Sequence, residues 1–199
     1  MSKQHIDSMS KAVKTYFAAA QNAAAKIGKN NTRYREDIAA EENAKVRGQL
    51  EAARREAESA IREAQEAGRA DAFQWGKLSG ADVTDDAKLL QMQLTPDQFS
   101  DLVGRYKSNG TMSAMLAQYG EKRNKDAGAE FGPYDLTQVP TAEKKAAVYD
   151  RFAMSALDLI DYMDRDKGIM SGVDSPMLQE AVEQFGKPSA FNQELFDLL

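Results

Sequence analysis

Residues 50–68 read LEAARREAESAIREAQEAG and consist almost entirely of alanine, glutamate and arginine. All three residue types favour the helical state, so the stretch predicts a helix. Its only large aliphatic side chains belong to Leu50 and Ile61. A helix with so few bulky apolar residues has to pack through small side chains.

Small apolar residues recur every seven positions in the segment around this stretch. A seam of methyl-sized side chains lets a second helix approach closely. We therefore expect a helix over residues 33–73 that packs against another helix. The two series are Ala39, Val46, Ala53, Ala60 and Ala67, and Leu50, Ala57 and Ala64.

A heptad pattern over residues 4–27 supplies the expected partner, because its apolar positions alternate spacings of three and four. Gly28 and the following Lys-Asn-Asn predict the end of this helix and a turn. The two segments together predict an antiparallel hairpin or coiled-coil arm. The apolar positions are Ile6, Met9, Val13, Tyr16, Ala20, Ala23 and Ile27.

The second helix is long for a chain of this size. At ~1.5 Å per residue, residues 33–73 extend for ~60 Å, whereas a compact globule of 199 residues has a diameter near ~42 Å. We expect the helix to project and to bury its seam against another copy of the chain, which predicts a homo-oligomer. The predicted protein-contact residues are Val13, Ala20, Val46, Leu50, Ala53, Ala57 and Ala60.

Two alternatives to projection remain open at this point. The helix could break near Gly48 or Gly68. It could also be stable without a partner, through glutamate–arginine pairs such as Glu51–Arg55, although each such pair contributes only a few tenths of a kcal/mol.

Residues 74–83, QWGKLSGADV, interrupt the helical pattern with two glycines. They predict a boundary between an arm of residues 1–75 and a compact helical body of residues 83–199. Trp75 is expected to anchor the junction, and residues 120–140 are expected to form an irregular loop. The expected fold is all-α, with an N-terminal helical hairpin followed by a helical bundle. The body helices are expected to begin at the caps Thr84, Thr95, Thr111, Thr141 and Ser175.

The charge of the chain is uneven. The whole chain carries a net charge of −5, but residues 1–35 contain seven basic residues and one acid. Such a basic arm suits pairing with acidic helices within or between copies, and the alternative is a nucleic-acid-associated protein. No run of apolar residues is long enough for a membrane span, so no membrane partner is expected.

Residue types suited to catalysis are scarce. The chain has no cysteine and a single histidine, His5, so disulfides, zinc–thiolate sites and histidine-rich metal sites are not expected. Asp158, Asp161 and Asp164 are spaced like ligands of a hard cation, but the following DRDKG sequence, residues 164–168, departs from the calcium-loop pattern. We expect no metal, no cofactor and no enzymatic activity; the alternative is a small enzyme or metal-binding protein with a carboxylate site.

Residues 94–123, LTPDQFSDLVGRYKSNGTMSAMLAQYGEKR, resemble a helix–turn–helix-like pair of small helical proteins from the structural gene clusters of tailed bacteriophages and prophages. The alanine-rich arm is similar to phage assembly and scaffolding factors. This resemblance implies a non-enzymatic head or tail protein that self-associates or binds other phage structural proteins, in the bacterial cytoplasm or the virion. The resemblance involves Leu94, Thr95, Pro96, Phe99, Leu102, Tyr106, Asn109, Thr111, Met112, Leu116 and Tyr119.

Overall fold

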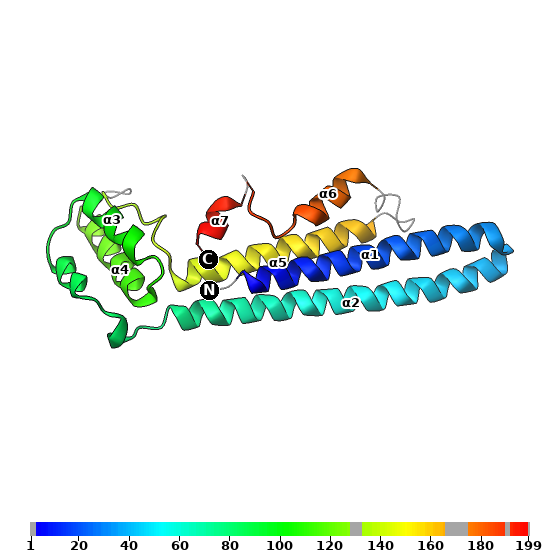
Figure 1. Ribbon diagram of the computed structural model, residues 1–199, viewed down its shortest axis with the longest axis horizontal. Helices are drawn as coiled ribbons and strands as arrows, with labels where there is room; N and C mark the ends of the chain where they lie inside the picture. The colour runs from blue at the N-terminus through cyan, green and yellow to red at the C-terminus, as the bar shows by residue number, and fades with distance from the viewer. Residues whose placement is uncertain (1–2, 128–132, 166–174, 190–191, 199) are drawn as a thin grey trace. The chain divides into compact units, whose positions relative to one another are not determined.

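The computed structural model describes residues 3–127, 133–165, 175–189 and 192–198, and every regular element among them is a helix. The expected all-α class is therefore confirmed (Figure 1). The elements are α1 (Gln4–Arg33), α2 (Glu36–Trp75), the 3₁₀ turns η1 (Gly80–Asp82) and η2 (Asp85–Gln91), α3 (Pro96–Tyr106), α4 (Gly110–Asp126), α5 (Ala142–Arg165), α6 (Pro176–Gln184) and α7 (Gln193–Asp197).

The chain forms two compact units, which we name the hairpin unit and the middle unit. The hairpin unit comprises residues 2–68 and 149–196, and the middle unit comprises residues 69–148 together with the last residues of the chain. This division differs from the expected one at residues 75–83. The cause is α5, because its part from Tyr149 onward packs with the hairpin rather than with the middle of the chain.

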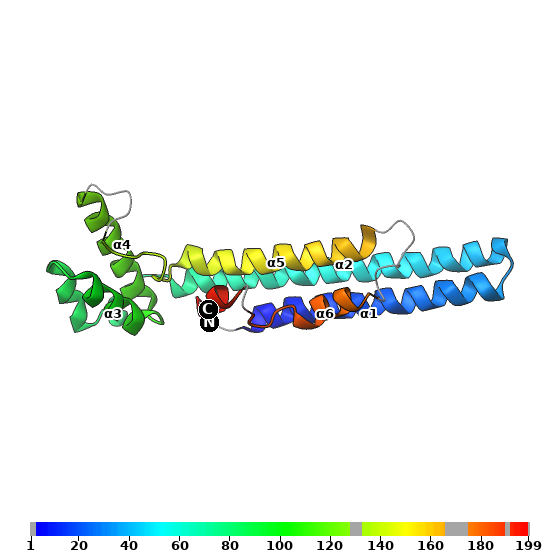
Figure 2. The ribbon, with the colours of Figure 1, turned by 90° about the horizontal axis from the view of Figure 1, so that it is seen from above.

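In the hairpin unit, α1 and α2 run antiparallel as the heptad patterns predicted (Figures 1 and 2). The predicted end of α1 at Gly28 is wrong, since the helix continues to Arg33 and Tyr34 is extended, with ψ 158°. Gly28 has no neighbour within 4 Å of its Cβ position. No close packing therefore interrupts the helix at this residue. The two helices instead join at Tyr34 and Arg35.

A third helix lies along this hairpin. Figure 2 shows α5 running beside α2, and hydrogen bonds between the two helices confirm this. Gln65 donates to Asp150 at 2.7 Å and Arg54 to Asp161 at 2.5 Å. At Gly68, an added Cβ would lie 2.6 Å from the Tyr149 ring. Both glycines at which α2 could have broken therefore lie within a continuous helix, and Gly68 permits the close approach of α5.

The middle unit is built around α3 and α4. Thr95 and Gln98 form the expected capping box at the start of α3. The α4 cap differs from the prediction, because Asn109 accepts a hydrogen bond from Met112 N–H, whereas Thr111 is buried and accepts from Ser79 N–H. The asparagine directly before the helix therefore serves as its N-cap, and the threonine two residues later does not.

The expected loop over residues 120–140 is also corrected, because α4 continues to Asp126. Gly120 does not end the helix, since it lies where Phe99 and Leu136 pack closely and leave no space for a Cβ. Residues 133–139 then return to the core, with Asn124 bonded to Tyr134 through both its amide oxygen and its amide nitrogen. Part of the expected loop, residues 128–132, lies outside the described residues.

The remaining predicted caps divide into two groups. Thr141 accepts from Lys144 N–H at 3.2 Å and starts α5 as expected. Thr84 and Ser175 precede helical turns but make no side-chain cap, and the Thr84 hydroxyl bonds to Tyr106 instead. Trp75 lies at the end of α2 as an anchor, donating from Nε1 to the Ser108 carbonyl at 3.1 Å.

Candidate protein-contact surface

The structure places most of the predicted contact residues inside a single chain. Five of them, Val13, Ala20, Val46, Leu50 and Ala57, are at most 9% exposed, while Ala53 and Ala60 are half-buried. In the ribbon, α1 lies along α2, and α5 runs along part of α2 (Figures 1 and 2). The alanine seam is thus an internal core, and these five residues are not accessible to a second copy while the hairpin is closed.

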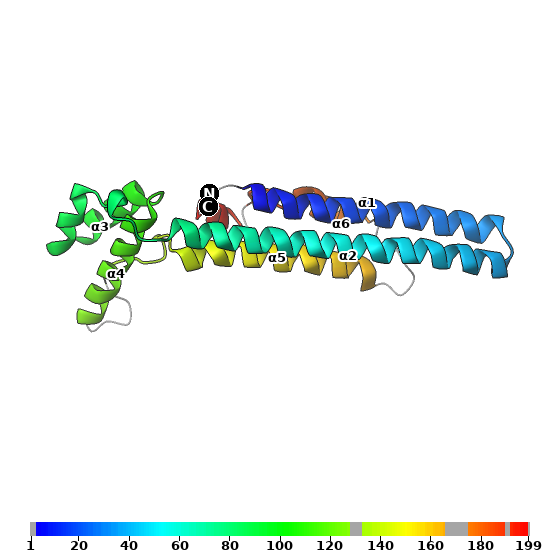
Figure 3. The same cartoon turned by 90° about the horizontal axis from the view of Figure 1, so that it is seen from below.

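The hairpin contains a different accessible region. The contact between Arg54 and Asp161 lies four residues before the end of α5. Beyond that end, α1 and α2 continue as a pair that no other described helix of the hairpin unit covers (Figures 2 and 3). We name residues 27–47 the hairpin end.

The hairpin end exposes two large apolar side chains and contains a shallow hollow that Tyr34, but not Ile38, lines. Tyr34 is 39% exposed and Ile38 is 42% exposed. The hollow has a volume of about 510 Å³ and combines apolar, amide and guanidinium groups. Tyrosine and arginine are enriched at protein-binding surfaces, so this composition is typical of a protein contact. The lining residues are Ile27, Asn31, Tyr34, Glu36, Ala39, Ala40, Asn43 and Arg47.

Three asparagines fix the geometry below this hollow. Asn43 is buried, its Nδ2 donates to Asn31 Oδ1 at 2.7 Å, and its Oδ1 accepts from Asn30 Nδ2 at 3.0 Å. We call this group the asparagine clasp. A buried amide that is satisfied in one alignment only specifies helix register, as polar residues at coiled-coil seams do. The clasp could not be recognised from the sequence, because two asparagines shortly after a glycine are also typical of a turn.

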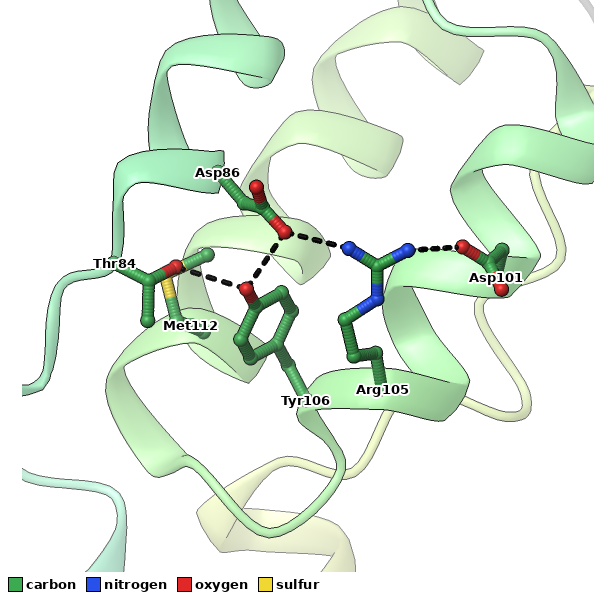
Figure 4. A network of polar contacts seen from close by, with 6 residues as sticks. All are labelled: Thr84, Asp86, Asp101, Arg105, Tyr106 and Met112. Carbon is green, nitrogen blue, oxygen red and sulfur yellow. Dashed lines mark hydrogen bonds and ion pairs between the residues drawn. The ribbon is translucent and has the colours of Figure 1, made fainter.

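A polar cluster in the middle unit is the main alternative site (Figure 4). Tyr106 donates to Asp86 at 2.7 Å, and Thr84 Oγ1 lies 3.1 Å from the Tyr106 hydroxyl. Arg105 bridges Asp86 and Asp101 at 2.7 and 2.6 Å. The hydrogen bond from Tyr106, assisted by Arg105, lowers the pKa of Asp86 below its usual value.

The chemistry of this cluster is that of a structural hydrogen-bond network. An ionised carboxylate that already accepts from a tyrosine and an arginine is a weak base, because both partners stabilise its charged form. Its members link η2 to α3, in addition to the packing of Leu90 against the core cluster that contains Phe99 and Leu102. The cluster therefore orders the start of the middle unit and does not form a nucleophile–base pair.

Two lysines at the start of α5 are also used internally. Lys144 donates to the carbonyls of Leu136, Thr137 and Val139. Lys145 lies 4.5 Å from the centre of the Trp75 ring and donates to the Leu198 carbonyl, and burial lowers its pKa to about 8. Both ammonium groups therefore bind backbone carbonyls, and that of Lys145 also lies over an aromatic ring, within the middle unit.

The carboxylates singled out in the sequence do not assemble a metal site in the described part of the chain, where no group of three potential ligands meets. Asp161 pairs with Arg54, whereas the Asp164 side chain and residues 166–174 of the DRDKG region lie outside the description. His5 packs edge-on against Tyr149, with ring centres 5.7 Å apart. Among the described helices, none has the length and hydropathy required to cross a membrane.

Comparisons of this chain with protein-family models, with curated proteins and with solved structures gave no match. The surfaces of the chain itself therefore give the indications of its function. Among these surfaces, the hairpin end combines exposed apolar side chains with a hydrogen-bonded asparagine clasp.

Proposed function

We propose that this protein is a non-enzymatic structural or assembly protein that binds a partner protein through its hairpin end. The observation that carries the proposal is the exposure of Tyr34 and Ile38 on a two-helix stretch beyond α5. A hairpin that served only as a scaffold for α5 would need no such extension. The asparagine clasp supports the proposal because a register-locked hairpin presents its end in one conformation.

The proposed setting is a tailed phage or prophage, with the protein acting as a scaffold or as a head or tail accessory. The support is the sequence resemblance over residues 94–123, which fold as α3, α4 and their connection. The partner would then be another structural protein or a second copy, met in the bacterial cytoplasm or in the virion.

This proposal replaces the seam by the hairpin end as the contact surface between proteins. A second copy could use Val13 or Ala57 only by opening the hairpin, because both side chains are buried within the chain. Tyr34, Ile38 and Arg47 need no rearrangement to meet a partner, since all three are exposed.

The test is a double substitution, Tyr34→Ser with Ile38→Ser. We expect the wild-type protein to gain mass in light scattering, alone or with the products of its neighbouring genes, and we expect the variant to lose this gain. A side chain that becomes buried in an interface contributes about 2 kcal/mol or more when it is a hot spot, so the loss of even one such anchor should lower the affinity by about thirtyfold.

The matched control is Tyr162→Ser with Met177→Ser, which removes a tyrosine and a long apolar side chain that are 63% and 81% exposed elsewhere in the hairpin unit. This control should associate like the wild type. If both variants associate equally well with the partner, the hairpin end is not the contact surface.

A further inference from the structure

The outward face of α1 carries a row of basic side chains. At about 100° per residue these positions fall within an arc of roughly 120°, on the side of α1 opposite its buried seam. All are exposed, and the only acid in α1 is Asp7, near its start. We name this set the basic face: Lys11, Lys14, Lys26, Lys29 and Arg33.

The lysines of this face are not neutralised by the part of the chain that the structure describes. Within the described ranges, Lys11, Lys14, Lys26 and Lys29 form no ion pair or hydrogen bond through their side chains. The neighbouring helix behaves differently, because Lys45 pairs with Glu41 and Glu42 on α2. The basic face therefore presents a local positive field, although the whole chain carries a net charge of −5.

We propose that the basic face binds the phosphate backbone of nucleic acid without reading its sequence. From Lys11 to Arg33 the face extends for ~33 Å along a straight helix, which matches roughly ten base pairs of duplex at ~3.4 Å each. Phosphate contacts made by such a row position a duplex or a single strand and carry no sequence information.

The side chains around the lysines favour nucleic acid over an acidic protein. Protein interfaces are depleted in lysine and need aromatic or apolar anchors at their centre. Here four of the five charges are lysines, and the exposed residues between them include Thr15, Ala18 and Ala25. The aromatic Tyr16 is buried in the seam. A surface of separate point charges fits a polyanion such as a phosphate chain.

The test uses a labelled DNA duplex, a single strand of the same length, and polyglutamate as the acidic-peptide probe. Binding is measured by fluorescence anisotropy at several salt concentrations. The test variant neutralises Lys11→Gln, Lys14→Gln, Lys26→Gln and Lys29→Gln. Since each neutralised phosphate contributes a slope of about −0.9 to log K against log salt, this variant should show a slope shallower by about 3.6 on the duplex.

The matched control removes the same charge from exposed lysines elsewhere, as Lys107→Gln, Lys122→Gln, Lys125→Gln and Lys187→Gln. It should keep the wild-type slope, as should a variant with arginine at the four α1 positions. Circular dichroism verifies that all variants remain helical. Equal DNA binding by the two glutamine variants, or binding to polyglutamate but not to DNA, overturns the proposal.

This inference is independent of the proposed protein contact. The Tyr34→Ser, Ile38→Ser variant keeps all five basic residues, so it should lose partner binding and retain DNA binding. The four α1 glutamine substitutions should have the reverse effect.

Discussion

The hairpin unit and the middle unit are stabilised in different ways. The hairpin unit buries a long series of small side chains, such as Ala20, Ala23 and Ala57, each of which contributes little apolar area. The middle unit concentrates its burial in one cluster, where Phe99, Tyr119 and Tyr134 lie with ring centres 5.0 to 6.1 Å apart.

Their polar groups differ in the same way. In the middle unit, two buried tyrosine hydroxyls hold the backbone of Leu94, with Tyr134 donating to its carbonyl and Tyr119 accepting from its N–H. In the hairpin unit, side-chain hydrogen bonds between helices are spread along their length, as the asparagine clasp and the contacts of Gln65 with Asp150 and Arg54 with Asp161 show. From this comparison we expect that single substitutions in the aromatic cluster strongly lower the stability of the middle unit. We expect the stability of the hairpin unit to depend on the distance between its helices.

The largest expected effect is in the middle-unit cluster. Phe99→Ala should destabilise the middle unit by about 3–5 kcal/mol, because Phe99 is buried and central to the aromatic cluster. Hydrogen exchange should show lost protection over α3 and α4. The control is Phe73→Ala, a residue 45% exposed, which should change stability far less. Equal losses for both variants would contradict the idea of a concentrated core.

A pair of glycines on α2 tests the spacing of the hairpin unit. Gly68→Ala should destabilise by about 1–3 kcal/mol, because its Cβ would overlap the Tyr149 ring and push α5 outward. Gly48→Ala has open space and should stabilise by about 1 kcal/mol through helix propensity. Urea denaturation measures both. Stabilisation by both substitutions would show that α5 does not pack closely at Gly68.

The smallest expected effect compares two helix starts, one in each unit. Thr95→Ala removes a complete capping box and should destabilise α3 by about 1 kcal/mol. Ser175 precedes α6 and forms no side-chain cap, so Ser175→Ala should leave stability nearly unchanged. Thermal unfolding of the two variants checks the difference, and a larger loss at Ser175 would reverse the assignment of the caps.

The sequence predicted the elements better than it predicted their partners. The heptads over residues 4–27 and the alanine series in α2 determined two antiparallel helices, because periodicity reports directly which face is buried. However, the small side chains of the α2 seam do not specify which helix packs against them. The occupant of the α2 seam therefore could not be distinguished between another copy and α5.

Glycines were the least reliable signals. Gly28, Gly48 and Gly120 all lie inside helices, although each was a candidate helix end or break. Only tertiary packing separates a tolerated glycine from a terminating one, as the fit of Gly120 against Leu136 shows. The hairpin end was missed for a related reason, since exposure of Tyr34 and Ile38 depends on where α5 ends, which no local pattern reports.

The asparagine clasp has a consequence for how this hairpin could change length. Its amides are satisfied only when residues 30 and 31 lie opposite residue 43. Adding one turn to α1 alone would shift the two helices past each other and leave polar groups unsatisfied between them. A longer hairpin would therefore require insertions of equal length in α1 and α2. These insertions would have to lie on the side of the clasp away from the connection between the helices, so that the clasp and the connection stay unchanged.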